Sequence, residues 1–171
     1  LYADDVVLLS STFEGAQAML TRLEQKSIPL GLLINVSKTQ AVSLNHSPKR
    51  PFTTSAGAIE SCNSFVYLGC MVPRSDDDIN RRRSLAWMAM GKLRPLLHSS
   101  LQLKVKAKLF TVLVETVLLY GAETWTLTPS AEKKLDATHA CLLHSAMNLC
   151  WPNKTTNGEM YRMAELKHPS V

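Results

Sequence analysis

The chain has 171 residues, of which 46% are apolar and 6% aromatic, and its formal net charge is +5. This composition supports a packed core and excludes a low-complexity or largely disordered chain. The sequence shows no secretory signal, no CxxC pair among its four cysteines and no apolar run near the roughly 20 residues of a membrane span, so we expect an intracellular protein, nuclear or cytoplasmic, with free thiols and no membrane partner.

The first elements predicted along the chain are a strand and a helix. The apolar, β-branched run Val6–Leu9 is typical of a buried strand. Ser11 and Glu14 form the pattern of a capping box, which predicts that a helix starts near Thr12. Pro29 and the glycine that follows predict the end of this helix.

Three further segments complete the first part of the chain. Residues 32–44 return to β-type residues around Lys38, and residues 45–57, with two prolines and a glycine, predict a loop. Residues 64–72 predict another strand. Gly69 inside it indicates a bulge or a close approach of two backbone segments.

From residue 79 onward the apolar residues recur at helical spacing. They predict one helix that carries Leu85, Met88, Leu93, Leu96 and Leu97. A second helix is predicted over residues 101–120, and a third begins near Ser130 and carries Leu135 and Leu142.

The predicted fold class is therefore α+β. Short antiparallel strands with one helix occupy residues 1–75, and about three helices occupy residues 76–171.

Two adjacent carboxylates, Asp4 and Asp5, precede the first apolar run. Aspartate tolerates turn conformations and accepts hydrogen bonds from nearby backbone, so a polar turn explains the pair by itself. Two carboxylates at a tight turn, near a third from another strand, could instead hold Mg²⁺ for phosphoryl transfer. The pair alone favours neither interpretation.

A long stretch between Ile79 and Val114 contains no acidic residue. A helical region with such one-sided charge could follow a phosphate backbone, or it could be an ordinary solvated face. The lysines between residues 104 and 108 alternate with other residues and spread over a broad arc, which favours loose electrostatic contact over base reading. The basic residues of this stretch are Arg81, Arg82, Arg83, Lys92, Arg94, Lys104, Lys106 and Lys108.

His139, Cys141, His144 and Cys150 are residue types that bind zinc. Their spacing does not form two-ligand knuckles, so we expect them on the core side or the surface of a helix. The tryptophans are expected to be packing anchors of the helical part; they are Trp87, Trp125 and Trp151.

Taken together, several segments resemble the reverse transcriptases of non-LTR (LINE-type) retrotransposons. YADD is similar to the metal-binding box, GLLINVSKTQAV to the box that follows it, and FVYLGCMV to the primer-grip segment. RRRSLAWMAMGKLRPLL, KLFTVLVETVLLYGAETWTLT and KKLDATHACLLHSAMNLCW resemble the thumb, and YGAETWTLT is particularly distinctive. In order and extent these segments cover nearly the whole chain.

The resemblance implies a C-terminal palm and thumb fragment of an RNA-directed DNA polymerase, a Mg²⁺-dependent nucleotidyltransferase. Residues 1–75 would be a partial palm and residues 76–171 the helical thumb. Asp4 and Asp5 would ligate the catalytic Mg²⁺, and Lys38 would lie near the pyrophosphate of the incoming nucleotide. From spacing alone, a solvated lysine at a strand end explains Lys38 equally well.

The resemblance also implies the nucleic-acid partners, an RNA template and a DNA primer. It places the basic residues listed above against the template–primer duplex. The primer grip would be formed by Phe65, Tyr67, Leu68 and Gly69, of which the apolar residues would also pack.

The family's active site needs another aspartate from a strand upstream of YADD. We expect this strand, the fingers and any endonuclease domain to lie outside the sequence, so that the chain alone binds Mg²⁺ poorly and does not polymerise DNA. Two alternatives remain open: a helical nucleic-acid-binding module without catalysis, and a degraded relic of the enzyme.

Overall fold

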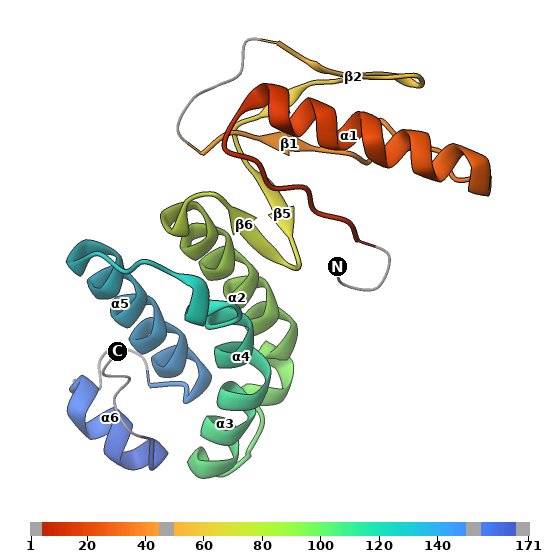
Figure 1. The fold of residues 1–171 in the computed structure, drawn as a ribbon. Helices are drawn as coiled ribbons and strands as arrows, with labels where there is room; N and C mark the ends of the chain where they lie inside the picture. The colour runs from red at the N-terminus through yellow and green to blue at the C-terminus, as the bar shows by residue number, and fades with distance from the viewer. Residues whose placement is uncertain (1–4, 45–49, 150–154, 167–171) are drawn as a thin grey trace. The chain divides into compact units, whose positions relative to one another are not determined.

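A computed structural model describes residues 5–44, 50–149 and 155–166 of the chain. The chain forms two compact units, Leu1–Phe65 and Val66–Val171 (Figure 1). This division precedes the predicted boundary at residue 75, because the segment after Phe65 folds onto the first helix of the second unit.

The first unit contains one long helix and four short strands. Strands β2 and β3 pair antiparallel, whereas β1 and β4 pair in parallel, with Ala41 opposite Ser61. Its elements are α1 (Phe13–Ser27), the 3-10 turn η1 (Ile28–Leu30), β1 (Ala41–Val42), β2 (Phe52–Thr54), β3 (Gly57–Ile59) and β4 (Ser61–Cys62).

Helix α1 begins and ends where the sequence predicts. Its N-cap is Thr12 rather than Ser11, because the Thr12 hydroxyl accepts a hydrogen bond from the Gly15 amide at 3.1 Å. The chain leaves the helix through η1 and turns at Gly31, whose φ is 75°.

Helix α1 packs on the β2–β3 hairpin. The rings of Phe13 and Phe52 stack with centroids 4.5 Å apart. The Gln17 side-chain amide donates to the Thr53 carbonyl at 2.8 Å and accepts from the Thr53 amide at 2.9 Å. The helix thus satisfies backbone groups along β2 that no strand pairs.

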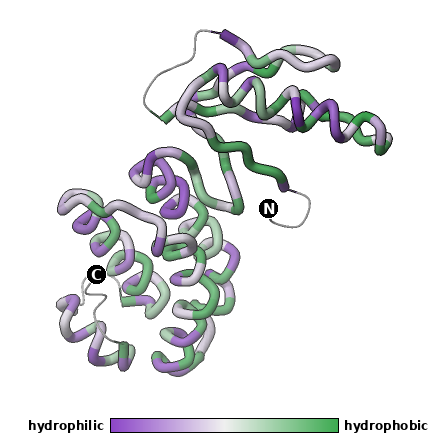
Figure 2. Tube along the Cα trace, in the orientation of Figure 1, coloured by the Kyte–Doolittle hydropathy of each residue, from purple (hydrophilic) through white to green (hydrophobic). Residues whose placement is uncertain are grey.

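Two sequence predictions for this unit are wrong. Residues 6–9 form no strand and are largely exposed, with Leu9 82% exposed, although they are strongly hydrophobic (Figure 2). Within the described residues no strand ladder or layer covers them, and an apolar run specifies a buried strand only when a partner is present. The loop predicted over 45–57 contains β2 and the start of β3, while residues 45–49 lie outside the described residues.

The second unit is a helical bundle with a β-hairpin at one end. The predicted helices are confirmed, and the last helix, preceded by a capping box of Thr156 and Glu159, was not predicted. Its elements are β5 (Phe65–Tyr67), β6 (Cys70–Val72), α2 (Ser75–Leu97), α3 (Leu103–Phe110), the π-helical turn η2 (Thr111–Glu115), α4 (Thr116–Leu118), the 3-10 turn η3 (Ala122–Thr124), α5 (Pro129–Ala146) and α6 (Asn157–Ala164).

The core of this unit lies between α2, the α3–η2–α4 run, α5 and α6. Phe110, Leu142 and Met160 are fully buried in it, one from each of three helices. Along α2 the buried face differs from the predicted one: Leu97 is buried, but Met88 is 57% exposed.

The observed architecture confirms the α+β fold class. In the described ranges, no helix has the length and apolar character needed to cross a membrane.

Candidate nucleic-acid interface

The segment FVYLGCMV folds as a hairpin rather than as one strand. Strands β5 and β6 are joined by the two-residue turn Leu68–Gly69, with φ of 47° and 83°. Positive φ at both central positions is the signature of the tight turn that suits the twist of paired strands. Gly69 therefore lies at the hairpin tip and not inside a strand.

The hairpin tip is held by side chains from the helical bundle. Arg81 Nη1 donates to the Gly69 carbonyl at 2.9 Å, and Arg82 Nη2 donates to the same oxygen. The Tyr120 hydroxyl, just after α4, donates to the Leu68 carbonyl at 3.2 Å. A Cβ at Gly69 would lie 3.1 Å from the Tyr120 ring and 3.4 Å from Arg82 Nη2. The close neighbours of this glycine are therefore side chains, whereas the sequence predicts a bulge or a second backbone segment.

Arg82 is enclosed on several sides. Its guanidinium carbon lies 4.2 Å from the centroid of the Tyr120 ring, a cation–π contact. Its Nε lies 3.9 Å from Asp78 Oδ1, and the residue is only 6% exposed.

Asp78 connects the hairpin, α2 and the segment after α4. Its Oδ1 accepts from the Met71 amide of β6 at 2.8 Å, and its Oδ2 accepts from the Trp125 indole nitrogen at 2.9 Å. The residue is 1% exposed, and a buried carboxylate is tolerated only with such hydrogen bonds and nearby cations. Its position in the first turn of α2 adds the favourable field of the helix N-terminus.

The distinctive segment YGAETWTLT supplies the platform for the hairpin. Gly121 has φ of 78°, and a Cβ at this position would overlap Cys70 Sγ of β6. Trp125 packs against the bundle core, as expected for an anchor. Thr128 then caps α5 by accepting from the Ala131 amide at 3.2 Å.

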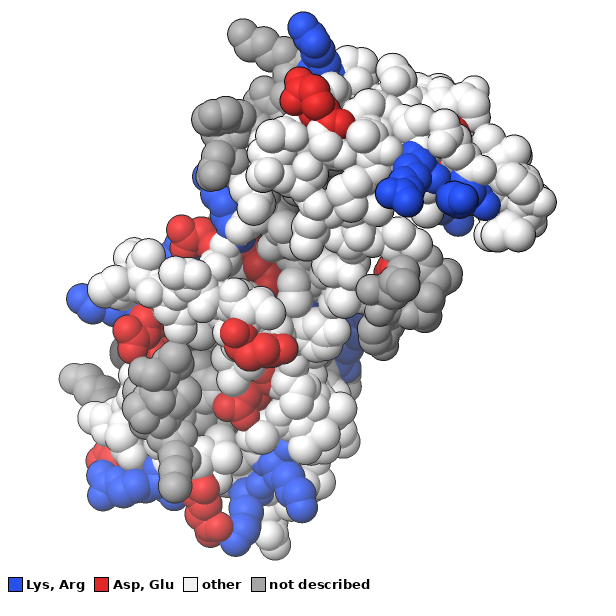
Figure 3. All heavy atoms as spheres, in the orientation of Figure 1, with Lys and Arg blue, Asp and Glu red and all other residues white. Residues whose placement is uncertain are grey.

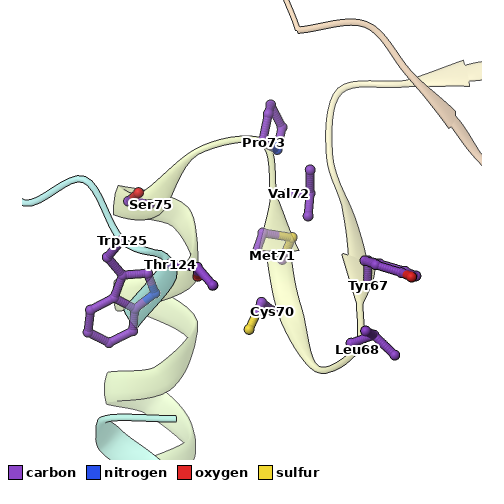
Figure 4. A pocket seen from close by; sticks show the side chains of 9 residues that line it. All are labelled: Tyr67, Leu68, Cys70, Met71, Val72, Pro73, Ser75, Thr124 and Trp125. Carbon is purple, nitrogen blue, oxygen red and sulfur yellow. The ribbon is translucent and has the colours of Figure 1, made fainter. Parts of the chain in front are cut away.

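A hollow of about 300 Å³ lies between the hairpin and Trp125 (Figure 4). Its wall is mainly apolar and includes no charged side chain. Ser75 Oγ at its edge accepts from the Thr126 amide at 3.0 Å. The lining residues are Tyr67, Leu68, Cys70, Met71, Val72, Pro73, Ser75, Thr124 and Trp125.

The basic residues of the acid-free stretch fall into two groups. Four of them are bonded within the protein or buried: Arg81, Arg82, Arg83 and Lys106. Of these, Arg83 Nε donates to Thr138 Oγ1 on α5 at 2.7 Å. Lys104 is exposed but paired, with Nζ 2.8 Å from Glu165 Oε2. The remaining three are exposed on α2 and α3: Lys92, Arg94 and Lys108.

The charge on the helical unit is unevenly distributed. On the face in Figure 3, basic side chains gather at the end of the unit where α3 lies, and acidic side chains lie farther up the same face. Helix α4 carries no acidic residue, but Glu115 of η2 and Glu123 of η3 flank it. A polyanion therefore meets favourable charge over α3 and repulsion beside α4.

The predicted catalytic residues lie in the first unit. Asp4 falls outside the described residues, and Asp5 is exposed. Lys38 is exposed in a turn, where its amide donates to the Asn35 carbonyl at 3.1 Å. In the described ranges no hydrogen bond or ion pair joins Lys38 to Asp5, and no three His, Cys, Asp or Glu residues gather in a group that could hold a metal ion. The Mg²⁺ site therefore stays a prediction.

The zinc-type residues of α5 differ in their surroundings where they are described. His139 is buried, Cys141 is exposed, and His144 Nε2 lies 3.1 Å from Asn157 Oδ1; Cys150 lies outside the described residues. Trp87 is exposed on α2 and is not a packing anchor.

Sequence reasoning missed a buried polar network that joins η2, α5 and α6. His139 Nδ1 lies 2.8 Å from the Tyr161 hydroxyl, and its Nε2 lies 3.0 Å from Glu115 Oε1. A neutral imidazole satisfies both contacts when Nε2–H donates to the carboxylate and Nδ1 accepts from the hydroxyl. The three residues are far apart in sequence, so no local pattern could reveal them.

Two residues of the network have shifted pKa values. The hydrogen bond from His139 holds the pKa of Glu115 below its usual value. Burial raises the pKa of Tyr161 to about 12, with smaller contributions from the negative charges of Asp136 and Glu115.

Comparison with known proteins gives one informative match. The chain is 30% identical over 148 residues to an uncharacterised transposon-derived protein of Caenorhabditis elegans, covering 82% of this chain and 53% of that protein. The chain is related to a transposon-derived protein. It spans about half the length of this relative. No family model and no solved structure gives a significant match.

Proposed function

We propose that the chain is a palm and thumb part of a non-LTR retrotransposon reverse transcriptase, and that its hairpin and helices bind the duplex of RNA template and DNA primer. The transposon-derived relative supports the origin. The main support for the enzyme class is that the segments FVYLGCMV and YGAETWTLT, both similar to segments of that family, meet in space around Asp78 and Arg82.

Duplex binding in this proposal is electrostatic. The exposed cations Lys92, Arg94 and Lys108 are free to approach phosphates, because they make no side-chain hydrogen bond or ion pair in the described part of the chain. The internally bonded arginines of α2 would support the fold of the interface instead.

Catalysis in the proposed parent enzyme would be nucleotidyl transfer. Asp4 and Asp5 would hold Mg²⁺, which stabilises charge on the reacting phosphates. Asp5 is exposed and carries the hard oxygen ligands that Mg²⁺ prefers. Lys38, also exposed, would neutralise charge on the leaving pyrophosphate.

The first test measures duplex binding by fluorescence anisotropy over a range of salt concentrations. We expect affinity to fall steeply with salt, and Lys92→Gln, Arg94→Gln and Lys108→Gln each to reduce the log–log slope by about one. Lys133→Gln, at an exposed lysine of α5, is the matched control and should leave the slope unchanged. Absence of binding at low salt would contradict the proposal and favour the relic.

A primer-extension assay with Mg²⁺ tests whether this chain polymerises DNA alone. We expect no extension, and template-dependent extension that Asp4→Asn abolishes would overturn that expectation. Salt-dependent binding without extension agrees with a truncated part of the enzyme and with the alternative, a non-catalytic nucleic-acid-binding module, which the extensive helical core of the second unit supports.

A further inference from the structure

We infer that Arg82 is a positioning residue that, with Asp78, fixes the orientation of the β5–β6 hairpin, and that it is not one of the residues that contact phosphate. This inference rests on the proposed function, since the hairpin matters for binding only if it meets the primer strand. It divides the basic residues of the acid-free stretch into those that bind the duplex and those that maintain the fold of the interface.

The Arg82 side chain is enclosed on three sides. The Gly69 carbonyl, the Tyr120 ring and the Asp78 carboxylate each face its guanidinium. To reach a phosphate, this 6% exposed residue would have to leave these partners and strip a buried carboxylate of a nearby cation. An exposed residue such as Lys92 has no comparable barrier.

The hairpin is fixed to α2 at two separate points. Arg81 and Arg82 bind the carbonyl at its tip, while Asp78 binds the amide of Met71 in β6. All three side chains belong to the first turns of α2. The hairpin therefore moves together with α2, and its tip cannot tilt without breaking charge-assisted hydrogen bonds.

The hairpin exposes apolar side chains at and near its tip. In the described residues, the hydrogen bonds from the bundle to the turn all end on backbone carbonyls, and the Leu68 side chain is 41% exposed. Val66 on β5 is also exposed. The network thus sets the direction of apolar side chains at the tip without covering them.

The salt dependence of duplex binding distinguishes the two roles. A lost phosphate contact lowers the slope by about 0.9, whereas a lost positioning contact lowers affinity at an unchanged slope. We expect Arg82→Gln to weaken binding about three- to tenfold without changing the slope, and Arg82→Lys to recover part of the loss, because an ammonium can still donate to the Gly69 carbonyl. Lys92→Gln serves as the matched phosphate-contact variant. A slope reduction for Arg82→Gln equal to that for Lys92→Gln would overturn the inference.

A measurement without nucleic acid tests the same network independently. In the two-dimensional NMR spectrum, Arg82→Gln should shift the amide signals of Gly69 and Met71 while those of α5 stay in place. Tyr120→Phe removes only the hydroxyl and keeps the ring beside Arg82, so it should shift the amide signals near Leu68. If Arg82→Gln fails to fold, Tyr120→Phe should still fold and serves in its place. Unchanged hairpin signals in both variants would overturn the inference even if the duplex binds. Absence of duplex binding by the unsubstituted chain, with the shifts observed, would contradict the proposed function alone.

Discussion

At the scale of single residues, the packing of the hairpin on the bundle depends on a few residues whose contacts or backbone conformation another residue type would not reproduce. Asp78 accepts hydrogen bonds from β6 and from the segment after α4, and its carboxylate lies 3.9 Å from Arg82 Nε. Gly121 combines a left-handed backbone with direct contact to Cys70. Each of these residues couples the hairpin to the bundle.

We predict that Gly121→Ala destabilises the protein by about 2 kcal/mol or more. The added methyl group would overlap Cys70 Sγ, and an alanine with φ of 78° is strained. Urea unfolding followed by circular dichroism measures the change.

Two further variants separate these causes. Cys70→Ala in the Gly121→Ala background should recover the part due to overlap but not the backbone strain. Gly91→Ala, in the middle of α2 with open space around it, should instead stabilise by about 0.5–1 kcal/mol. Equal effects at both glycines would refute the steric explanation.

At the scale of elements, α6 is tied to the bundle by the network of Glu115, His139 and Tyr161. The network lies at η2, the π-helical turn between α3 and α4. A π-turn inserts an extra residue and rotates the helix that follows it. Glu115 thereby closes a polar connection across three elements whose other contacts are mainly apolar.

This network predicts a pH dependence of stability with two limits. Because the folded-state pKa of Glu115 is lowered, its contribution is complete above its ordinary value of 4.5 and is lost as pH falls through the folded-state value. Because the folded-state pKa of Tyr161 is raised to about 12, its contribution is complete below 10 and is lost as pH rises toward 12.

Chemical denaturation at several pH values measures both limits. Glu115→Gln should reduce the loss of stability on the acid side, and Tyr161→Phe should reduce it on the alkaline side. Glu132→Gln, on the first turn of α5, is a control outside the network. An unchanged acid limit in Glu115→Gln would show that the network does not contribute.

The sequence predicts where the helices of this protein lie better than it predicts which segments pack or pair with one another. Capping and helical spacing locate α1, α2 and α5, because these signals are local. The run Val6–Leu9 misleads, because burial of a strand depends on neighbours that an apolar pattern does not name. The parallel pairing of β1 with β4 has no local signal at all.

The same limit applies to the candidate interface. Gly69 is recognised from sequence as a special backbone position, because glycine inside an apolar run indicates one, but its place at a hairpin tip beside side chains of the bundle is not recognised. The roles of Arg81, Arg82 and Arg83 are not recognised either, because each residue turns a helix by about 100° and neighbouring arginines meet different surroundings. Arg82 meets the hairpin and Arg83 meets α5.

At the scale of the whole molecule, the two units differ in how much apolar surface they bury. In the described part of the first unit, only Leu20 and Ile59 are buried apolar residues. The second unit buries apolar side chains from every one of its long helices. Local stability follows the burial of such contacts, so the two units should open independently.

Hydrogen exchange followed by mass spectrometry tests this difference. We predict that amides of α1 and β2 exchange faster than those of α2 and α5, by a factor of about ten or more. Comparison of α1 with α5, which are similar in length, controls for helix length. Equal protection of the two helices would contradict the prediction.

The Leu68–Gly69 turn has a further consequence for the hairpin. Leucine at φ of 47° occupies a conformation that costs about 1–2 kcal/mol, whereas asparagine or glycine adopts it readily. The hairpin therefore exposes an apolar side chain at its tip, and its turn adopts an unfavourable backbone conformation as a result. Its strands are only three residues long, and the arginines and tyrosine beneath the tip supply the restraint that the turn sequence lacks.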